Sequence, residues 1–147
     1  MSIAYDAITT TSGTGDLSWT HTPVGVPKGI LVYVFEAANA DHIVGVTYGG
    51  KAMVEVSGSP LANTGGENIS VHCFFLGSGI PTGDQTVVVD VNNTALTKPA
   101  YCISLTALGS VLIKKTDVSI NSTGVENPTG TIALSGQTCW VVEGFTS

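Results

Sequence analysis

Apolar and polar side chains alternate with a period of two along most of this chain, a pattern that predicts β-strands. The runs are rich in valine, isoleucine, threonine and aromatic residues, which favour strands, and glycine, asparagine, serine or proline separates them. No stretch has the period of an amphipathic helix. We therefore expect an all-β fold, an antiparallel β-sandwich. The expected strands are 17–22, 30–37, 43–48, 51–56, 69–76, 85–91, 101–108 and 111–120.

Three details of this pattern place individual segments. Residues 30–37 (ILVYVFEA) are apolar at successive positions until Glu36, which is typical of a central strand covered on both faces. Gly49 and Gly50 form a two-residue link between alternating runs, and such a link predicts a hairpin with a type I′ turn. The small, polar and glycine-rich segment 57–68 predicts an exposed loop.

The length of 147 residues suits one domain. We expect residues 1–14 to form an N-terminal arm and residues 15–147 to form a single β-sandwich domain. Residues 130–146 repeat the order of features in 15–37, and the sequence stops directly afterwards. Either another chain completes the last sheet or the native chain is longer. We favour the longer chain, because a bare, flat edge strand promotes aggregation.

The charge pattern narrows the possible partners. Charged residues make up 11% of the chain, the formal net charge is −6, and there is no arginine. These features argue against nucleic-acid binding, which depends on basic contacts to phosphate. No apolar run approaches the roughly 20 residues of a membrane span, and no signal peptide is visible. We therefore expect a protein that binds neither nucleic acid nor membrane.

The sequence contains no strong catalytic or metal-binding motif. Residues 45–51 have the spacing of a phosphate-binding loop, but Ala52 stands where a magnesium-binding hydroxyl belongs. The histidines and cysteines lack the spacing of a metal site or a disulfide framework. We expect no enzyme activity, no cofactor and no metal. The histidines and cysteines are His21, His42, His72, Cys73, Cys102 and Cys139.

Aromatic side chains either fill the core of a sandwich or stack on sugar rings at its surface. We expect most of them in the core, but Trp19 and Tyr48 have polar neighbours in the sequence and are expected at the surface. Leu61 and Asn63 lie in the predicted loop, and Trp140 lies in the last apolar run. These five residues are the candidate contacts with a partner protein or a glycan.

Several segments resemble a family of jelly-roll-like β-sandwich domains found in bacteriophage virion proteins and in modules of bacterial surface proteins. The hairpin VTYGGKAMVEV at 46–56 carries much of the resemblance, together with LSWTHT at 17–22 and FFLGSGIPTGDQTVVVDV at 74–91. The family tends to have a proline pair where this chain has Gly-Ser-Gly-Ile-Pro. The resemblance extends from about residue 15 onward, and it implies a jelly-roll-like sandwich.

The same resemblance implies a non-enzymatic virion protein, first a capsid decoration or cement protein and second a fibre or tail part. Such a protein is assembled in the host cytoplasm and contacts the major capsid protein, and we expect it to be a homotrimer. The low charge fits a subunit whose surface is covered by neighbours. The alternative is a carbohydrate-binding or adhesin module that uses Trp19, Tyr48 and the loop 57–68.

Overall fold

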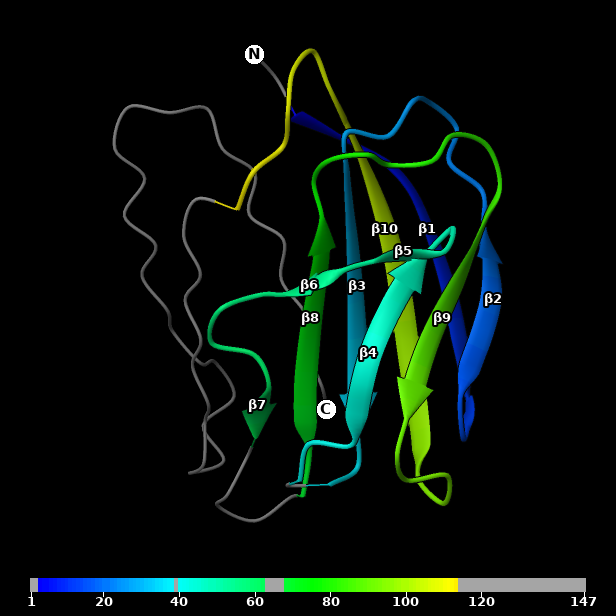
Figure 1. The fold of residues 1–147 in the computed structure, drawn as a ribbon, viewed down its shortest axis with the longest axis vertical. Coiled ribbons are helices and arrows are strands. Elements are labelled where there is room, and N and C mark those ends of the chain that lie inside the picture. The colour runs from blue at the N-terminus through cyan, green and yellow to red at the C-terminus, as the bar shows by residue number, and fades with distance from the viewer. Residues whose placement is uncertain (1–2, 39, 63–67, 114–147) are drawn as a thin grey trace.

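The computed structural model describes residues 3–38, 40–62 and 68–113, and every regular element in these ranges is a β-strand (Figure 1). The strands predicted at 43–48 and 85–91 have the expected bounds. Residues 111–113 are not in a strand, and the rest of the strand predicted at 111–120 lies outside the described residues. The strands are β1 (Ile3–Thr14), β2 (Leu17–His21), β3 (Gly29–Glu36), β4 (Ile43–Tyr48), β5 (Lys51–Ala52), β6 (Val54–Glu55), β7 (Leu61–Ala62), β8 (Ser70–Leu76), β9 (Gln85–Val91) and β10 (Thr97–Ala107).

These strands form two antiparallel sheets that pack face to face. The first sheet has the order β1-β10-β3-β8-β6, with β7 also paired to β8, and the second has the order β2-β9-β4-β5. The pairs β1–β10, β2–β9, β3–β8 and β4–β5 are nested along the chain, as in a long hairpin folded over on itself. This nesting is the topology of a jelly roll, so the predicted antiparallel, jelly-roll-like sandwich is confirmed.

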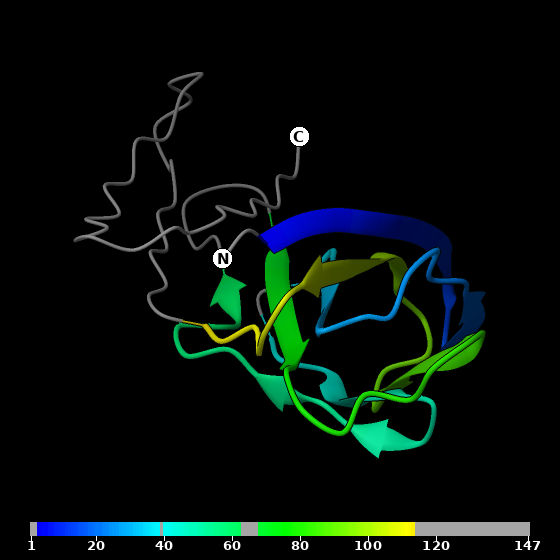
Figure 2. The ribbon, with the colours of Figure 1, turned by 90° about the horizontal axis from the view of Figure 1, so that it is seen from above.

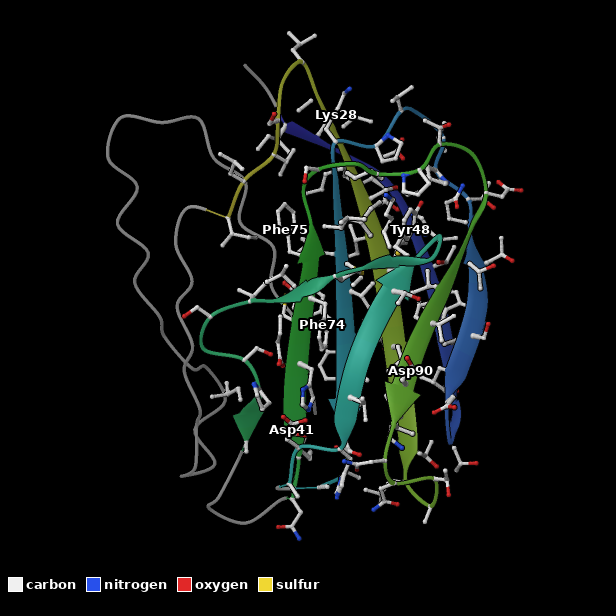
Figure 3. All side chains as sticks on the ribbon, in the orientation of Figure 1. Lys28, Asp41, Tyr48, Phe74, Phe75 and Asp90 are labelled. Carbon is white, nitrogen blue, oxygen red and sulfur yellow. The ribbon has the colours of Figure 1, made fainter. Side chains whose placement is uncertain are left out.

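The core between the sheets is built from side chains at alternating positions. On β8, Phe74 points into this core and Phe75 points to the opposite side of its sheet (Figure 3). β-Branched side chains pack well on such a pleated surface, and burying each one contributes roughly 1.5–3 kcal/mol. The inner cluster includes Ile30, Val32, Val34 and Phe74 from the first sheet and Val46, Val87 and Val89 from the second.

The strand predicted at 51–56 is in fact two short strands that belong to different sheets. β5 pairs with β4 in the second sheet, and β6 pairs with β8 in the first. Between them the amide of Met53 donates to the carbonyl oxygen of Val46 at 2.9 Å, and the Met53 side chain is buried. The chain thereby crosses between the sheets and closes one side of the sandwich, opposite β1 (Figure 2).

The expected N-terminal arm at 1–14 needs correction, because Ile3–Thr14 forms β1, a strand of 12 residues. It pairs with β10 along its whole length, from Ile3 opposite Ala107 to Thr14 opposite Thr97. A register shift between Tyr5 and Ala7 interrupts the alternation of side chains. Because of this bulge and the many small hydroxyl residues that follow it, hydrophobic periodicity did not predict the strand.

The hairpin predicted at Gly49 and Gly50 is confirmed. The φ angles of these residues are 55° and 75°, and a type I′ turn requires positive φ at both central positions. The amide of Gly49 also donates to the carbonyl oxygen of Thr86 at 2.8 Å, which anchors the turn beside the start of β9. The two glycines therefore differ in their surroundings although they share a backbone conformation.

This difference predicts unequal effects of alanine at the two positions. A Cβ atom at Gly49 would lie 2.9 Å from Cγ of Pro81, whereas a Cβ atom at Gly50 would meet no heavy atom within 4 Å. In urea unfolding, Gly50→Ala should therefore lower the free energy of unfolding by about 1–2 kcal/mol through φ strain. Gly49→Ala should cost at least about 1 kcal/mol more because of overpacking. Equal losses would contradict this account of the turn.

Candidate functional site

The outer face of the first sheet, turned away from the core, is the leading candidate site. Ile8 lies opposite Ile103, and Thr10 lies opposite Tyr101, in the pairing of β1 with β10. These side chains point outward because Ala100, next to Tyr101, is part of the inner core. We call this surface the β1–β10 face. Its members are Tyr5, Ile8, Thr10, Tyr101 and Ile103.

The β1–β10 face is apolar, uncharged and open. Tyr5, Ile8 and Tyr101 have exposed fractions of 49%, 47% and 37%. The ring of Tyr101 is held edge-on against Phe35, with ring centroids 5.5 Å apart and an interplanar angle of 87°. Adjoining apolar side chains exposed on one surface are typical of an interaction site.

The neighbouring part of the same outer face is covered. Val111, which follows β10, packs with Leu31 and Leu105 in a second apolar cluster, and all three side chains are buried. A Cβ atom at Gly29 would lie 3.0 Å from Val111, so the glycine leaves the space that Val111 fills. The first sheet is therefore apolar on both faces, and its outer face leaves large apolar side chains exposed on the β1–β10 side and at Val54 on β6.

A second candidate is a layer of charged side chains at the end of the core where β3 ends and β10 begins. Glu36 and Lys98 are 1% and 0% exposed, and the Lys98 ammonium lies 3.9 Å from Oε1 of Glu36. The ammonium also donates to the carbonyl oxygens of Asn93 and Leu96, both at 2.9 Å. Buried charges are tolerated when they are paired and hydrogen-bonded in this way.

His42 approaches the same carboxylate from the segment between β3 and β4. Its Nδ1 atom lies 3.1 Å from Oε1 of Glu36. Within the described ranges, neither Glu36 oxygen makes a hydrogen bond of good geometry, and the Lys98 ammonium is the opposite charge that lies beside the carboxylate. The Glu36 carboxylate thus holds two segments at the same end of the sandwich. One segment contains His42, and the other precedes β10.

His72 on β8 is the centre of a neighbouring polar group. Its Nδ1 atom lies 3.1 Å from Oε1 of Glu55 and 4.0 Å from Oδ1 of Asp41, and its Nε2 atom lies 3.3 Å from Oγ of Ser70. The order Glu55, His72, Ser70 is that of an acid, base and nucleophile. Ser70 is only 1% exposed and faces the core, so its hydroxyl lies away from solvent. The group instead joins β6 to β8.

At the other end of the sandwich, side chains join the edges of the two sheets. Oγ1 of Thr9 on β1 accepts a hydrogen bond from the indole N–H of Trp19 at 3.0 Å and lies 2.8 Å from Nδ1 of His21. Asp6, at the bulge, accepts from the amide of Gly25 at 2.8 Å and from the hydroxyl of Ser104 at 2.7 Å. The Asp6 carboxylate is therefore turned inward, away from the β1–β10 face.

Burial governs the ionisation of several histidine, tyrosine and cysteine side chains. It lowers the pKa of His21, an effect that the nearby Asp6 charge opposes, and it raises the pKa of Tyr48. Burial also raises the pKa of the Cys102 thiol and raises that of Cys73 to about 11. Both thiols are therefore protonated near neutral pH, a state in which cysteine is a poor nucleophile.

The residues proposed from sequence as contacts do not form one surface. Tyr48 is fully buried, so its expected surface position is wrong: it lies on the inward side of β4, with its ring 6.0 Å from that of His21. Trp19 is partly buried on β2, and Leu61 is partly buried on β7, in the other sheet. Asn63 and Trp140 lie outside the described residues.

Tyr101 and Ile103 of the β1–β10 face were missed for an identifiable reason. Tyr101 and Ile103 alternate in a predicted strand, but their outward direction depends on which face packs on the second sheet. Tyr5 and Ile8 lay in the expected arm, where no pairing was predicted. The alternation of large residues at positions 3 and 5 was the sequence signal that could have predicted a strand there.

Searches for other kinds of site and for similar proteins give negative results. Among the described residues, no group of three or more histidine, cysteine, aspartate or glutamate side chains is arranged to hold a metal ion. The described chain also contains no helix long and apolar enough to cross a membrane. No family model, curated protein or solved structure matches the chain.

Removing Lys98 should destabilise the fold strongly, because it leaves the buried Glu36 carboxylate without its ammonium partner. Lys98→Met should lower the free energy of unfolding by about 3–5 kcal/mol, and adding Glu36→Gln should recover part of the loss. The matched control, Lys51→Met at an exposed lysine, should change it by less than about 0.5 kcal/mol. Urea unfolding measures all three, and a loss at Lys98 no larger than at Lys51 would refute the buried pair.

The lowered pKa of His21 predicts a loss of stability in mild acid. The unfolded chain binds this proton at the ordinary histidine pKa of about 6.5, whereas the folded chain binds it only at lower pH. Stability should therefore fall as pH decreases below about 7, by at most about 1.4 kcal/mol per pH unit from this residue. The slope of unfolding free energy against pH should be smaller in His21→Gln and unchanged in Thr20→Ala. Equal slopes in all three proteins would contradict the assignment.

Proposed function

We propose that this chain is a non-enzymatic structural protein of a bacteriophage virion, and that it acts as a capsid decoration or cement protein. The observation that carries the proposal is the uncharged, apolar β1–β10 face, which a jelly-roll sheet leaves exposed. A protein with such a face gains stability when an assembly covers it. Assembly into a shell supplies that cover.

Two further observations support this proposal. Jelly rolls are an architecture of viral capsid domains, although the same fold also occurs in lectins and enzymes. The turn and strand segments at 17–22, 46–56 and 74–91 resemble those of virion domains. The low content of charged residues, 11%, is also typical of subunits with largely covered surfaces.

A decoration protein works by mass action on the assembled shell. It binds the assembled subunits and not the separated ones, so its binding free energy adds to the stability of the shell. At a free concentration 100 times the dissociation constant, one such site contributes about 2.7 kcal/mol. The chemistry is that of apolar burial, and it requires no catalytic group, metal or cofactor.

The carbohydrate-binding alternative loses part of its basis. It relied on Trp19 and Tyr48 as exposed stacking surfaces. Tyr48 is fully buried, and the indole N–H of Trp19 is bonded to Thr9 inside the seam between β1 and β2. The virion proposal uses the residues that are exposed, and we therefore prefer it.

The proposal predicts that the protein protects phage heads against heat. Heads of the phage whose genome encodes the chain should be stripped of the protein and heated with increasing amounts of it, while released DNA is measured. The midpoint temperature of release should rise with protein concentration, and the protein should sediment with the heads. An unrelated β-sandwich protein at equal concentration is the control. Unchanged release together with no co-sedimentation would overturn the proposal.

A further inference from the structure

We infer that Lys98 and Glu36 react with each other after folding and form an amide between Nζ of Lys98 and Cδ of Glu36. The ion pair seen in the structure is the state before this reaction. The amide is a covalent cross-link between β10 and β3 at one end of the core. It forms within one chain, so it goes beyond the proposed virion function and does not depend on it.

The register of β3 and β10 brings the two side chains together. Val34 pairs with Ala100 in this antiparallel ladder. Two residues further along each strand, the same register sets Glu36 opposite Lys98. Both side chains are buried, and the Lys98 ammonium lies 3.9 Å from Oε1 of Glu36. Well-oriented groups held together in one molecule react with effective concentrations of about 10⁵ M or more.

The hydrogen bonds around the pair leave it free to react. Nζ of Lys98 donates to the carbonyl oxygens of Asn93 and Leu96, both at 2.9 Å. These bonds use two of its three protons, and the remaining position lies toward Glu36. Among the described residues no donor makes a hydrogen bond of good geometry to either Glu36 oxygen. Conversion of the carboxylate to an amide therefore breaks no hydrogen bond of Glu36.

The reaction is a condensation that releases one water molecule. One proton passes from Nζ to Oε1, which gives an amine and a carboxylic acid. The lone pair of Nζ then forms a bond to Cδ, and the bond between Cδ and Oε1 breaks. Oε1 leaves as water with that proton and a second proton from Nζ. Both charges disappear from the core, and because buried charges carry a large desolvation penalty, burial favours the neutral amide.

His42 is placed to transfer the second proton. Its Nδ1 atom lies 3.1 Å from Oε1 of Glu36, the oxygen that leaves. The imidazolium form donates a proton to this oxygen as the bond to Cδ breaks, and the imidazole then recovers the proton from Nζ. The His42 side chain is 22% exposed and that of Glu36 is fully buried, so the imidazole connects the buried pair to solvent. Exclusion of bulk water from the pair protects the finished amide from hydrolysis.

Mass spectrometry of the full chain tests for the cross-link. After the folded wild-type protein has been kept at neutral pH, the denatured chain should be lighter than its sequence mass by one water molecule. Trypsin cuts after Lys51 and so separates Glu36 from Lys98 in an unlinked chain. The cross-link should instead hold fragment 29–51 to fragment 52–114. An unchanged mass, or a loss of water within a single unlinked fragment, would overturn the inference.

Three variants test the assigned roles. Lys98→Met should keep its full sequence mass, because it lacks the attacking nitrogen. His42→Gln retains the pair and should form the cross-link at least about tenfold more slowly than wild type. The matched control is Asp41→Asn, which changes the neighbouring exposed side chain and should react at the wild-type rate.

The rates are measured on chains isolated unfolded in urea from inclusion bodies, by following the loss of mass after refolding begins. Loss of water from Lys98→Met would overturn the cross-link. Equal rates in His42→Gln and wild type would overturn the proton transfer by His42.

Discussion

The structure depends on one constraint, which is that its larger sheet is apolar on both faces. Inward side chains such as Val32 and Phe74 pack on the second sheet, and outward side chains such as Leu31 and Phe75 need cover of their own. A sheet with two apolar faces is stable only when both faces are covered. The second sheet covers the inner face, and the outer face needs a further layer. Val111 covers one part of the outer face, and the β1–β10 face remains exposed.

Polar side chains at the two ends of the core fix the alignment of the strands. Glu36 and Lys98 occupy inward positions at one end, and Ser104 and His21 occupy inward positions at the other. A slip of one residue would move Glu36 to the outer face and separate it from Lys98. The apolar layers between these ends supply most of the driving force, while the paired polar groups oppose such a slip.

Local sequence pattern predicted the elements that depend on local chemistry and missed those that depend on distant contacts. The bounds of β4 and β9 and the Gly49–Gly50 turn followed from alternation and turn residues. The crossing at Met53 and the bulge at Asp6 did not, because alternation does not reveal which sheet a strand joins. Glu36 and His72 were visible as polar residues in apolar runs, but their partners come from other strands. Tyr48 was wrongly predicted at the surface. Its polar neighbours belong to the adjacent turn, whereas the tyrosine side chain itself is buried.

Burial of the β1–β10 face on assembly with phage heads is the central claim, and residue-level footprinting tests it most directly. Hydroxyl-radical oxidation of Tyr5 and Tyr101, read by mass spectrometry, should be compared between the free protein and the protein mixed with stripped heads, with Trp19 in the seam between β1 and β2 as the internal reference. The account predicts that oxidation of both tyrosines falls together when heads are present, while that of Trp19 stays constant. Tyrosine oxidation that is the same with and without heads would contradict it.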